Sequence, residues 1–275
     1  MPPILLAAVS AVVWGVGDFS GGKATQTSRA LAVTVLSQLA SLPVLAVGVV
    51  LMGGGPTAPG LAWGVAGGVI GFGGILLLYQ GLSRGAMAIF APISAVTTAL
   101  VPLGVGLALD RTPSMPALVG AGCAVVAIGL VSRARGESRA SIRIVALALA
   151  TGVCFGLFFV LLGRAGPGQG LWPIVGVRTG SIGTGLLAVL LTRESLRLAP
   201  AARPWAVVAG ATDVLANALY LLAAAQGPLA IVAPIGALYP VSTVLLALAV
   251  DRERVAPAQI AGLGLAATAL VLANT

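Results

Sequence analysis

The chain consists of long apolar runs separated by short stretches that hold most of the polar and charged residues. A membrane-spanning helix needs about 20 apolar residues, because the hydrocarbon core is about 30 Å thick and a helix rises about 1.5 Å per residue. The runs have this length, and none shows the alternating pattern of a membrane β-barrel. They predict ten transmembrane helices, at residues 3–21, 31–52, 60–82, 86–109, 115–132, 142–163, 171–192, 204–225, 229–250 and 256–273.

The second half of the chain repeats the first at an offset of about 141 residues. The segment Gly85–Ile93, Gly-Ala-Met-Ala-Ile-Phe-Ala-Pro-Ile, returns at Gly227–Ile235 as Gly-Pro-Leu-Ala-Ile-Val-Ala-Pro-Ile. Other matched positions are Asp110-Arg111 with Asp251-Arg252, Trp63 with Trp205, and Gly15 with Gly156. Shared Pro, Gly, Trp and Asp-Arg positions arise by chance less readily than matches among Ala, Leu and Val, so we infer an internal duplication.

Each copy holds five predicted spans, so the second copy must enter the membrane from the opposite side. We therefore expect an all-α integral membrane protein whose ten transmembrane helices form two inverted five-helix repeats, residues 1–136 and 137–275. The boundary between the repeats falls in the polar segment 132–139. Many secondary transporters are built from inverted repeats of this kind, so the duplication bears on function as well as fold.

Composition and charge agree with a membrane protein. Hydrophobic residues make up 59% of the chain and charged residues 8%, against roughly 25% charged residues in a soluble domain. The connections are too short to hold a soluble catalytic or nucleotide-binding domain. The net charge of +8 does not indicate a nucleic-acid partner, because the basic residues are scattered through short loops without aromatic neighbours. The expected partners are the lipid bilayer and a small-molecule substrate.

The basic residues predict the orientation in the membrane. Connections after odd-numbered spans hold Lys23, Arg29, Arg84, Arg133, Arg135, Arg139, Arg143, Arg193, Arg197, Arg203, Arg252 and Arg254, whereas the other side holds Arg111 and Arg164. By the positive-inside rule the first group faces the cytoplasm, which places both termini outside the cytoplasmic membrane. The opening Met1-Pro2-Pro3 has no basic region of a cleaved signal peptide, so the first span is expected to be retained.

The residues needed for catalysis or metal binding are scarce. The chain has no His and seven acids, and Cys123 and Cys154 both fall inside predicted spans. A membrane-embedded enzyme would need a nucleophile with a base or a carboxylate-rich metal cluster, and neither assembles from these residues. A channel is also disfavoured, because no charged ring or carbonyl filter is recognisable. We expect no enzyme activity, no cofactor and no metal.

Asp213 is the most informative single residue, because it lies near the middle of the predicted span 204–225. A charged side chain at that depth costs about 3 kcal/mol on insertion scales, so it must pair, face water or be protonated. Asn217 and Tyr220 follow at i+4 and i+7 on the same helical face. This polar face is either the wall of a substrate cavity or a cluster that only joins helices.

Three further residues within spans are candidates for the same site. Asp18 and Trp14 share one face of the first span, although Asp18 lies close enough to the span end to be interfacial. Arg178 could extend to the outer membrane surface or inward to Asp213. Weaker candidates for the cavity lining are Gln38, Tyr79, Gln80, Thr97, Phe155, Phe159, Tyr239, Ser242 and Thr243.

Pro92 and Pro234 occupy matching positions about two turns inside the fourth and ninth spans. Each removes a backbone hydrogen bond and should kink its helix. Their recurrence in both repeats favours a pair of hinges, although packing alone would also account for them.

The polar residues within the spans allow two kinds of ligand. An acid with a neutral partner can bind a cation or carry a proton, whereas an acid with an arginine can bind both ends of a zwitterion, and the residues leave both alternatives open.

Short motifs relate the chain to a known family. They are Trp14-Gly15 with Asp18-Phe19-Ser20-Gly21-Gly22, and Ala91-Pro92 with Ala233-Pro234, followed by short turns. On these residues the chain resembles the drug/metabolite transporter superfamily, and within it the EamA-type proteins with two five-helix repeats. Relatives usually carry a Gly-Glu pair in those turns, which Asp110-Arg111 and Asp251-Arg252 replace here. The resemblance implies a central cavity with alternating access that exports a small metabolite, such as an amino acid or a related compound.

Overall fold

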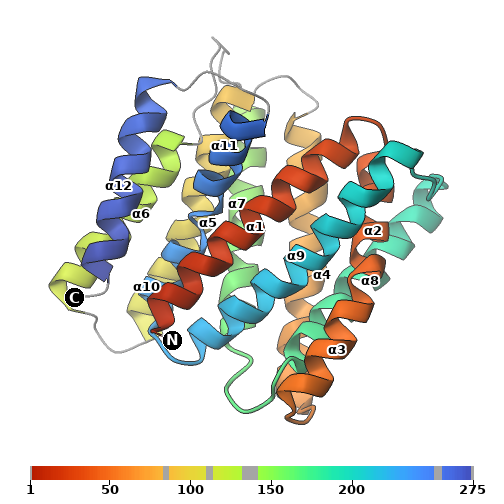
Figure 1. Ribbon diagram of the computed structural model, residues 1–275, viewed down its shortest axis with the longest axis horizontal. Helices are drawn as coiled ribbons and strands as arrows, with labels where there is room; N and C mark the ends of the chain where they lie inside the picture. Colours follow the sequence, from red (N-terminus) through yellow and green to blue (C-terminus); the bar gives the residue numbers. More distant parts are fainter. Residues whose placement is uncertain (1, 83–86, 110–113, 132–141, 251–255, 274–275) are drawn as a thin grey trace.

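The computed structural model describes residues 2–82, 87–109, 114–131, 142–250 and 256–273, and the regular elements in these ranges are all helical (Figure 1). Lipid offers no hydrogen-bond partners to the backbone, and a helix satisfies its own amides and carbonyls. The helices are α1 Pro3–Thr25, α2 Ala30–Ala40, α3 Leu42–Met52, α4 Ala58–Leu82, α5 Met87–Leu109, α6 Met115–Val131, α7 Ile142–Gly163, α8 Trp172–Thr192, the 3-10 turn η1 Pro200–Ala202, α9 Arg203–Ala224, α10 Leu229–Gly236, α11 Tyr239–Val250 and α12 Pro257–Ala273.

Six helical segments of the described chain are long and apolar enough to cross a membrane. They are Pro3–Thr25, Ala30–Met52, Ala58–Leu78, Ile142–Gly163, Trp172–Thr192 and Pro200–Ala224. Shorter apolar helices lie at Ile93–Leu109, Met115–Val131 and Leu229–Thr243. Large apolar side chains also cover the outside of the protein, and Val50 and Ile142 are 81% and 84% exposed. Lipid accounts for such a surface, so the fold is that of an all-helical membrane protein.

Two apolar runs that we expected to be regular helices each contain a short turn. The turn in the run 31–52 lies at Ser41, between α2 and α3, and that in the run 229–250 lies after Gly236, between α10 and α11, although each run continues across its turn as one apolar segment. A proline lies next to each turn, Pro43 at the start of α3 and Pro234 inside α10, and neither can donate a backbone hydrogen bond. By contrast, α5 is continuous from Met87 to Leu109 although it contains the same Ala-Pro-Ile motif.

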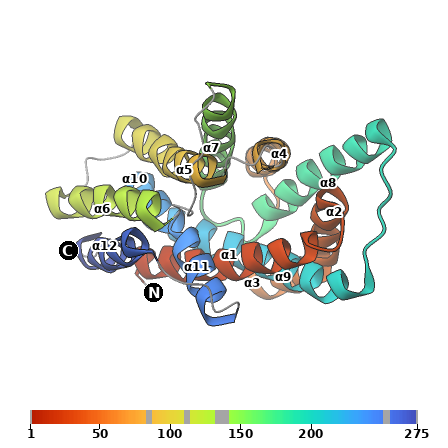
Figure 2. The same ribbon diagram turned by 90° about the horizontal axis from the view of Figure 1, so that it is seen from above.

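The helices pack as pairs that are distant in sequence. In Figure 1, α1 and α9 cross the middle of the protein together, α6 and α12 lie at one end, and α2, α3 and α8 lie at the other, an arrangement that Figure 2 shows from above. Ser10 of α1 lies against Ala216 of α9, whereas Gly21 lies against Ala209, so these two helices are antiparallel. The pairs α4 with α8 and α5 with α7 also pack closely.

Glycines allow α4 and α8 to approach closely. A β-carbon built on Gly64 would lie 3.1 Å from Cα of Gly176, and one built on Gly176 would lie equally close to Cα of Gly64. One turn further on, Gly68 faces the backbone of Val177. Small residues are what permits such contacts in lipid, where no hydrophobic effect drives helices together. The α4–α8 contact therefore sets the position of the α8 segment that carries Arg178.

Candidate functional site

The acid that the sequence singled out lies where α1, α8 and α9 meet. One oxygen of Asp213, Oδ1, accepts a hydrogen bond of 3.1 Å from Nε1 of Trp14 in α1. The other, Oδ2, forms an ion pair with Nη2 of Arg178 in α8. The three residues come from three different helices, and Trp14 and Asp213 are separated by 199 positions. The structure thus places Arg178 inward, toward Asp213, rather than at the membrane surface.

The two members of the ion pair differ in accessibility. The Arg178 side chain is 4% exposed, whereas the Asp213 side chain is 38% exposed. Nε of Arg178 is buried and lacks a hydrogen-bond partner among the residues that the structure describes. The arginine is therefore an enclosed counter-charge, and the carboxylate is the more exposed member of the pair. A carboxylate has about four acceptor positions, and two of those on Asp213 are occupied.

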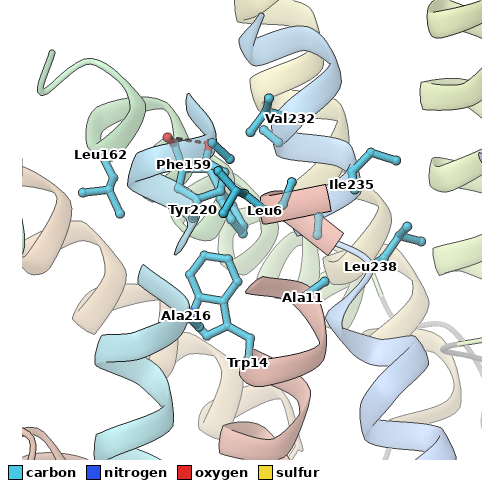
Figure 3. Close-up of a cluster of buried hydrophobic side chains, with 14 of the residues drawn as sticks. Leu6, Ala11, Trp14, Phe159, Leu162, Ala216, Tyr220, Val232, Ile235 and Leu238 are labelled. Atoms are coloured by element: carbon cyan, nitrogen blue, oxygen red, sulfur yellow. Dashed lines mark hydrogen bonds between the residues drawn. The ribbon is translucent and has the colours of Figure 1, made fainter. Parts of the chain in front are cut away.

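Three aromatic rings pack beside the pair and join α1, α7 and α9 (Figure 3). The ring centroids of Trp14 and Phe159 are 5.0 Å apart, those of Phe159 and Tyr220 are 4.8 Å apart, and the contacts are edge-to-face. The Tyr220 hydroxyl donates a 3.0 Å hydrogen bond to the carbonyl of Phe159. Edge-to-face pairs add about 0.5–1.5 kcal/mol each beyond the area they bury, so the cluster restrains the Trp14 ring and the bond it donates.

Ser10 joins α1 to α9, whereas Asn217 bonds to the backbone of its own helix α9. Asn217 is 1% exposed, and its amide donates a 2.7 Å bond to the Asp213 carbonyl. Its Oδ1 has no partner in the described part of the protein. The Ser10 hydroxyl donates a 2.8 Å bond to the carbonyl of Ala216. Asn217 and Tyr220 share a helical face with Asp213 as expected, but both are enclosed by neighbouring helices here.

Asp18 brings a second carboxylate to the site. It follows Trp14 by one turn of α1, is exposed, and lies near enough to Asp213 for the two charges to interact. Tyr239, the first residue of α11, is half-buried and lies within range of the Asp18 charge. Close packing of Gly15 against Ser242 brings α11 to this position. Within the described residues, the site thus holds a second carboxylate beside the one that pairs with Arg178.

The remaining predicted residues lie further out or outside the described side chains. Phe155 of α7 is half-buried and packs against Gly74 of α4. Pro234 is buried in α10, just before the division from α11. The side chain of Pro92 lies outside the described residues, as do those of Tyr79 and Gln80. The predicted repeat boundary at 132–139 also lies outside them.

One polar contact of the site region was missed at the sequence level. Ser181, one turn after Arg178, donates a hydrogen bond to Oε1 of Gln38 in α2, and both residues are buried. The sequence did contain a signal for Ser181, because it lies three residues after Arg178 and therefore on the same helical face. In the described ranges no group of three or more His, Cys, Asp or Glu residues is placed to hold a metal ion.

Comparison with known proteins gives the family. The model of the EamA-like transporter family matches twice, at residues 1–133 and 142–275. Among solved structures, one titled only "Crystal structure of protein" has a TM-score of 0.82 and 17% identity, and the match covers 99% of this chain and 98% of that chain. At that identity the likeness shows the fold alone. A search of curated proteins found no match. The family match confirms the resemblance in the sequence motifs, and the chain belongs to the EamA-like transporters of the drug/metabolite transporter superfamily, which are multi-pass membrane proteins.

Proposed function

We propose that this protein is a secondary carrier that moves a small organic metabolite across the cytoplasmic membrane by alternating access to a site around Asp213. Its ten spans would form two inverted five-helix repeats, residues 1–136 and 137–275, with both termini outside. The family resemblance favours export as the direction of transport. Asp213 or Asp18 could also carry a proton.

Matching contacts in the two halves support the inverted repeat. Gly15 of α1 packs against Ser242 of α11, and the equivalent Gly156 of α7 packs against Val101 of α5. In the same way, Gly68 of α4 and its equivalent Gly210 of α9 both face the backbone of the second span in the other half.

The helix directions support the inversion. Contacts of Gly64 and Gly68 make α4 parallel to α8, and contacts of Gly67 and Gly74 make α4 antiparallel to α7. Phe159 packs on Tyr220 and Gly163 lies against Ala224, so α7 is parallel to α9, whereas α1 is antiparallel to α9. The equivalent helices α1 and α7 therefore run in opposite directions, as inverted repeats require.

The observation that carries the proposal is the half-exposed Asp213 bonded to residues of both halves. Trp14 belongs to the first half, and Arg178 and Asp213 belong to the second. A movement of one half against the other would change the distance between Trp14 and Asp213. Such coupling between a central polar site and the interface of two bundles is what alternating access needs. Pro92 and Pro234 are the proposed hinges.

The charge distribution favours a substrate with a positively charged group. Asp213 and Asp18 are the accessible members of the site, whereas Arg178 is enclosed. An amine can donate to the free acceptor positions of Asp213 and interact favourably with the carboxylate of Asp18. A substrate whose only charge is a carboxylate would have to displace Asp213 from Arg178 and would meet repulsion from Asp18.

A binding and flux experiment tests the proposal. Purified protein would be screened by thermal shift against amino acids, the amines that lack their carboxylate, and the acids that lack their amine. A ligand at one hundred times its Kd stabilises the folded state by about 2.7 kcal/mol. We expect stabilisation by compounds with an amine, and saturable counterflow of the same compounds in proteoliposomes.

The matched variants are Asp213→Asn and Glu194→Gln, which make the same chemical change at the site and at the surface. We expect Asp213→Asn to abolish both stabilisation and counterflow, and Glu194→Gln to preserve them. Full flux in Asp213→Asn would remove this residue from the mechanism. Flux without saturation or counterflow would indicate a channel instead of a carrier.

A further inference from the structure

A hollow lies away from Asp213, between α2, the start of α9 and the connection that joins α8 to α9. Its volume is about 540 Å³. Most of its wall is apolar, with Leu36 from α2, Leu196 and Leu198 from the connection, and Val207 from α9. Two arginines, Arg197 and Arg203, complete it. The cavity thus combines an apolar wall with concentrated positive charge.

Among the described residues, no carboxylate pairs with the two arginines of this cavity. Arg197 and Arg203 are exposed, and neither has an ion-pair partner among the residues that the structure describes. The single acid in the sequence between Thr192 and Arg203 is Glu194, and it pairs with Arg29 at 3.8 Å. An anionic partner would therefore meet two guanidinium groups without displacing a carboxylate.

Neighbouring aromatic residues indicate the depth of the cavity in the membrane. The Trp205 ring is exposed and lies edge-to-face on Phe19, with centroids 6.3 Å apart. The Lys23 ammonium lies 5.4 Å from the centre of the same Phe19 ring. Exposed tryptophan and snorkelling lysine are typical of the boundary between lipid and water. Arg203 precedes Trp205 and lies on the water side, whereas the wall at Val207 lies on the lipid side.

We propose that this cavity binds an anionic phospholipid of the adjacent leaflet. Its phosphate would lie between Arg197 and Arg203, and an acyl chain would follow the apolar wall at Leu36 and Val207. The charge favours an anionic headgroup, because a zwitterionic lipid offers no net charge to the two arginines. The depth favours a lipid over a soluble anion. The connection joins the two helices that hold Arg178 and Asp213, so a bound lipid would restrain both.

The test is a lipid titration of the purified full-length protein in detergent, followed by native mass spectrometry. The probes are dioleoylphosphatidylglycerol and dioleoylphosphatidylcholine. A basic residue at the membrane surface contributes about 1 kcal/mol to anionic-lipid binding, so the double variant Arg197→Gln with Arg203→Gln should bind phosphatidylglycerol about 30-fold more weakly. Its binding of phosphatidylcholine should not change.

The control is the double variant Arg164→Gln with Arg193→Gln, which loses the same charge from residues that do not line the cavity. It should bind phosphatidylglycerol like the wild type. The double variant Arg197→Lys with Arg203→Lys keeps both charges and should retain tight binding, which separates charge loss from misfolding. Equal losses in the test and control variants, or a glutamine variant that binds normally, would overturn the proposal. So would competition by glycerol 1-phosphate at the lipid concentration, which would indicate a site for a soluble anion.

Discussion

The substitution Gly68→Ala tests whether the α4–α8 contact positions the ion pair. A β-carbon at Gly68 would lie 2.9 Å from the carbonyl carbon of Val177 and from the backbone nitrogen of Ser181, and closer still to the Val177 carbonyl oxygen. Ordinary carbon contacts need about 3.5 Å or more, so the two helices must separate by roughly 1 Å. Overpacking of this kind costs about 1–3 kcal/mol. Arg178 follows Val177 directly, so the same displacement would move its guanidinium away from Asp213.

Gly73→Ala is the matched control, because Gly73 lies on the same helix and a β-carbon there meets nothing within 4 Å. Both substitutions replace a helical Gly by Ala and gain about 1 kcal/mol of helix propensity, which cancels in the comparison. We expect Gly68→Ala to melt roughly 3–10 °C below Gly73→Ala in detergent. It should also lose flux in proteoliposomes, whereas Gly73→Ala should keep it.

A Gly68→Ala protein that melts at or above the temperature of Gly73→Ala would refute the reasoning. It would mean that α4 and α8 are free to move apart, as expected if the glycine face of α4 allows sliding. A lower melting temperature with full flux would show that the contact stabilises the fold without positioning Arg178.

Two other sets of substitutions test the contacts around Asp213. Tyr220→Phe removes the buried hydroxyl that donates to Phe159, so the free energy of unfolding should fall by about 1 kcal/mol in thermal denaturation; an unchanged value would mean that the hydroxyl does not stabilise the cluster. Arg178→Gln should destabilise the protein more than Arg178→Gln combined with Asp213→Asn, because the double variant leaves no unpaired charge at the site. Strictly additive losses in that cycle would show that the two side chains do not interact.

Much of the fold could be predicted because bilayer thickness imposes a length on each apolar run. The predicted span 3–21 lies within α1, and the span 142–163 coincides with α7. The interruption after Gly236 was not predicted as a division into two helices. Proline removes one hydrogen bond in any helix, but the neighbouring contacts decide whether the helix then ends, and the same motif lies within the continuous helix α5.

The candidate site could be predicted in part. Asp213 stood out because a charge in the middle of an apolar run is costly in any fold. Helical spacing also placed Asn217 and Tyr220 on the same face. The spacing did not decide whether this face lines a cavity or packs against neighbouring helices. In the structure Asn217 is 1% exposed and Tyr220 is fully buried, whereas Asp213 is half open.

The sequence by itself determined that this is a membrane protein of repeated apolar helices with one acid deep inside the second half. These properties depend on composition, on the length of apolar runs and on internal similarity, and each of them can be read directly from the amino-acid sequence. The tertiary structure alone decided that Arg178 reaches inward, that Trp14 donates to an aspartate 199 positions away, and that the acid remains the open member of the ion pair. The reason is that glycine contacts between distant helices set their rotation and separation, and a difference of one ångström there decides which side chains can meet.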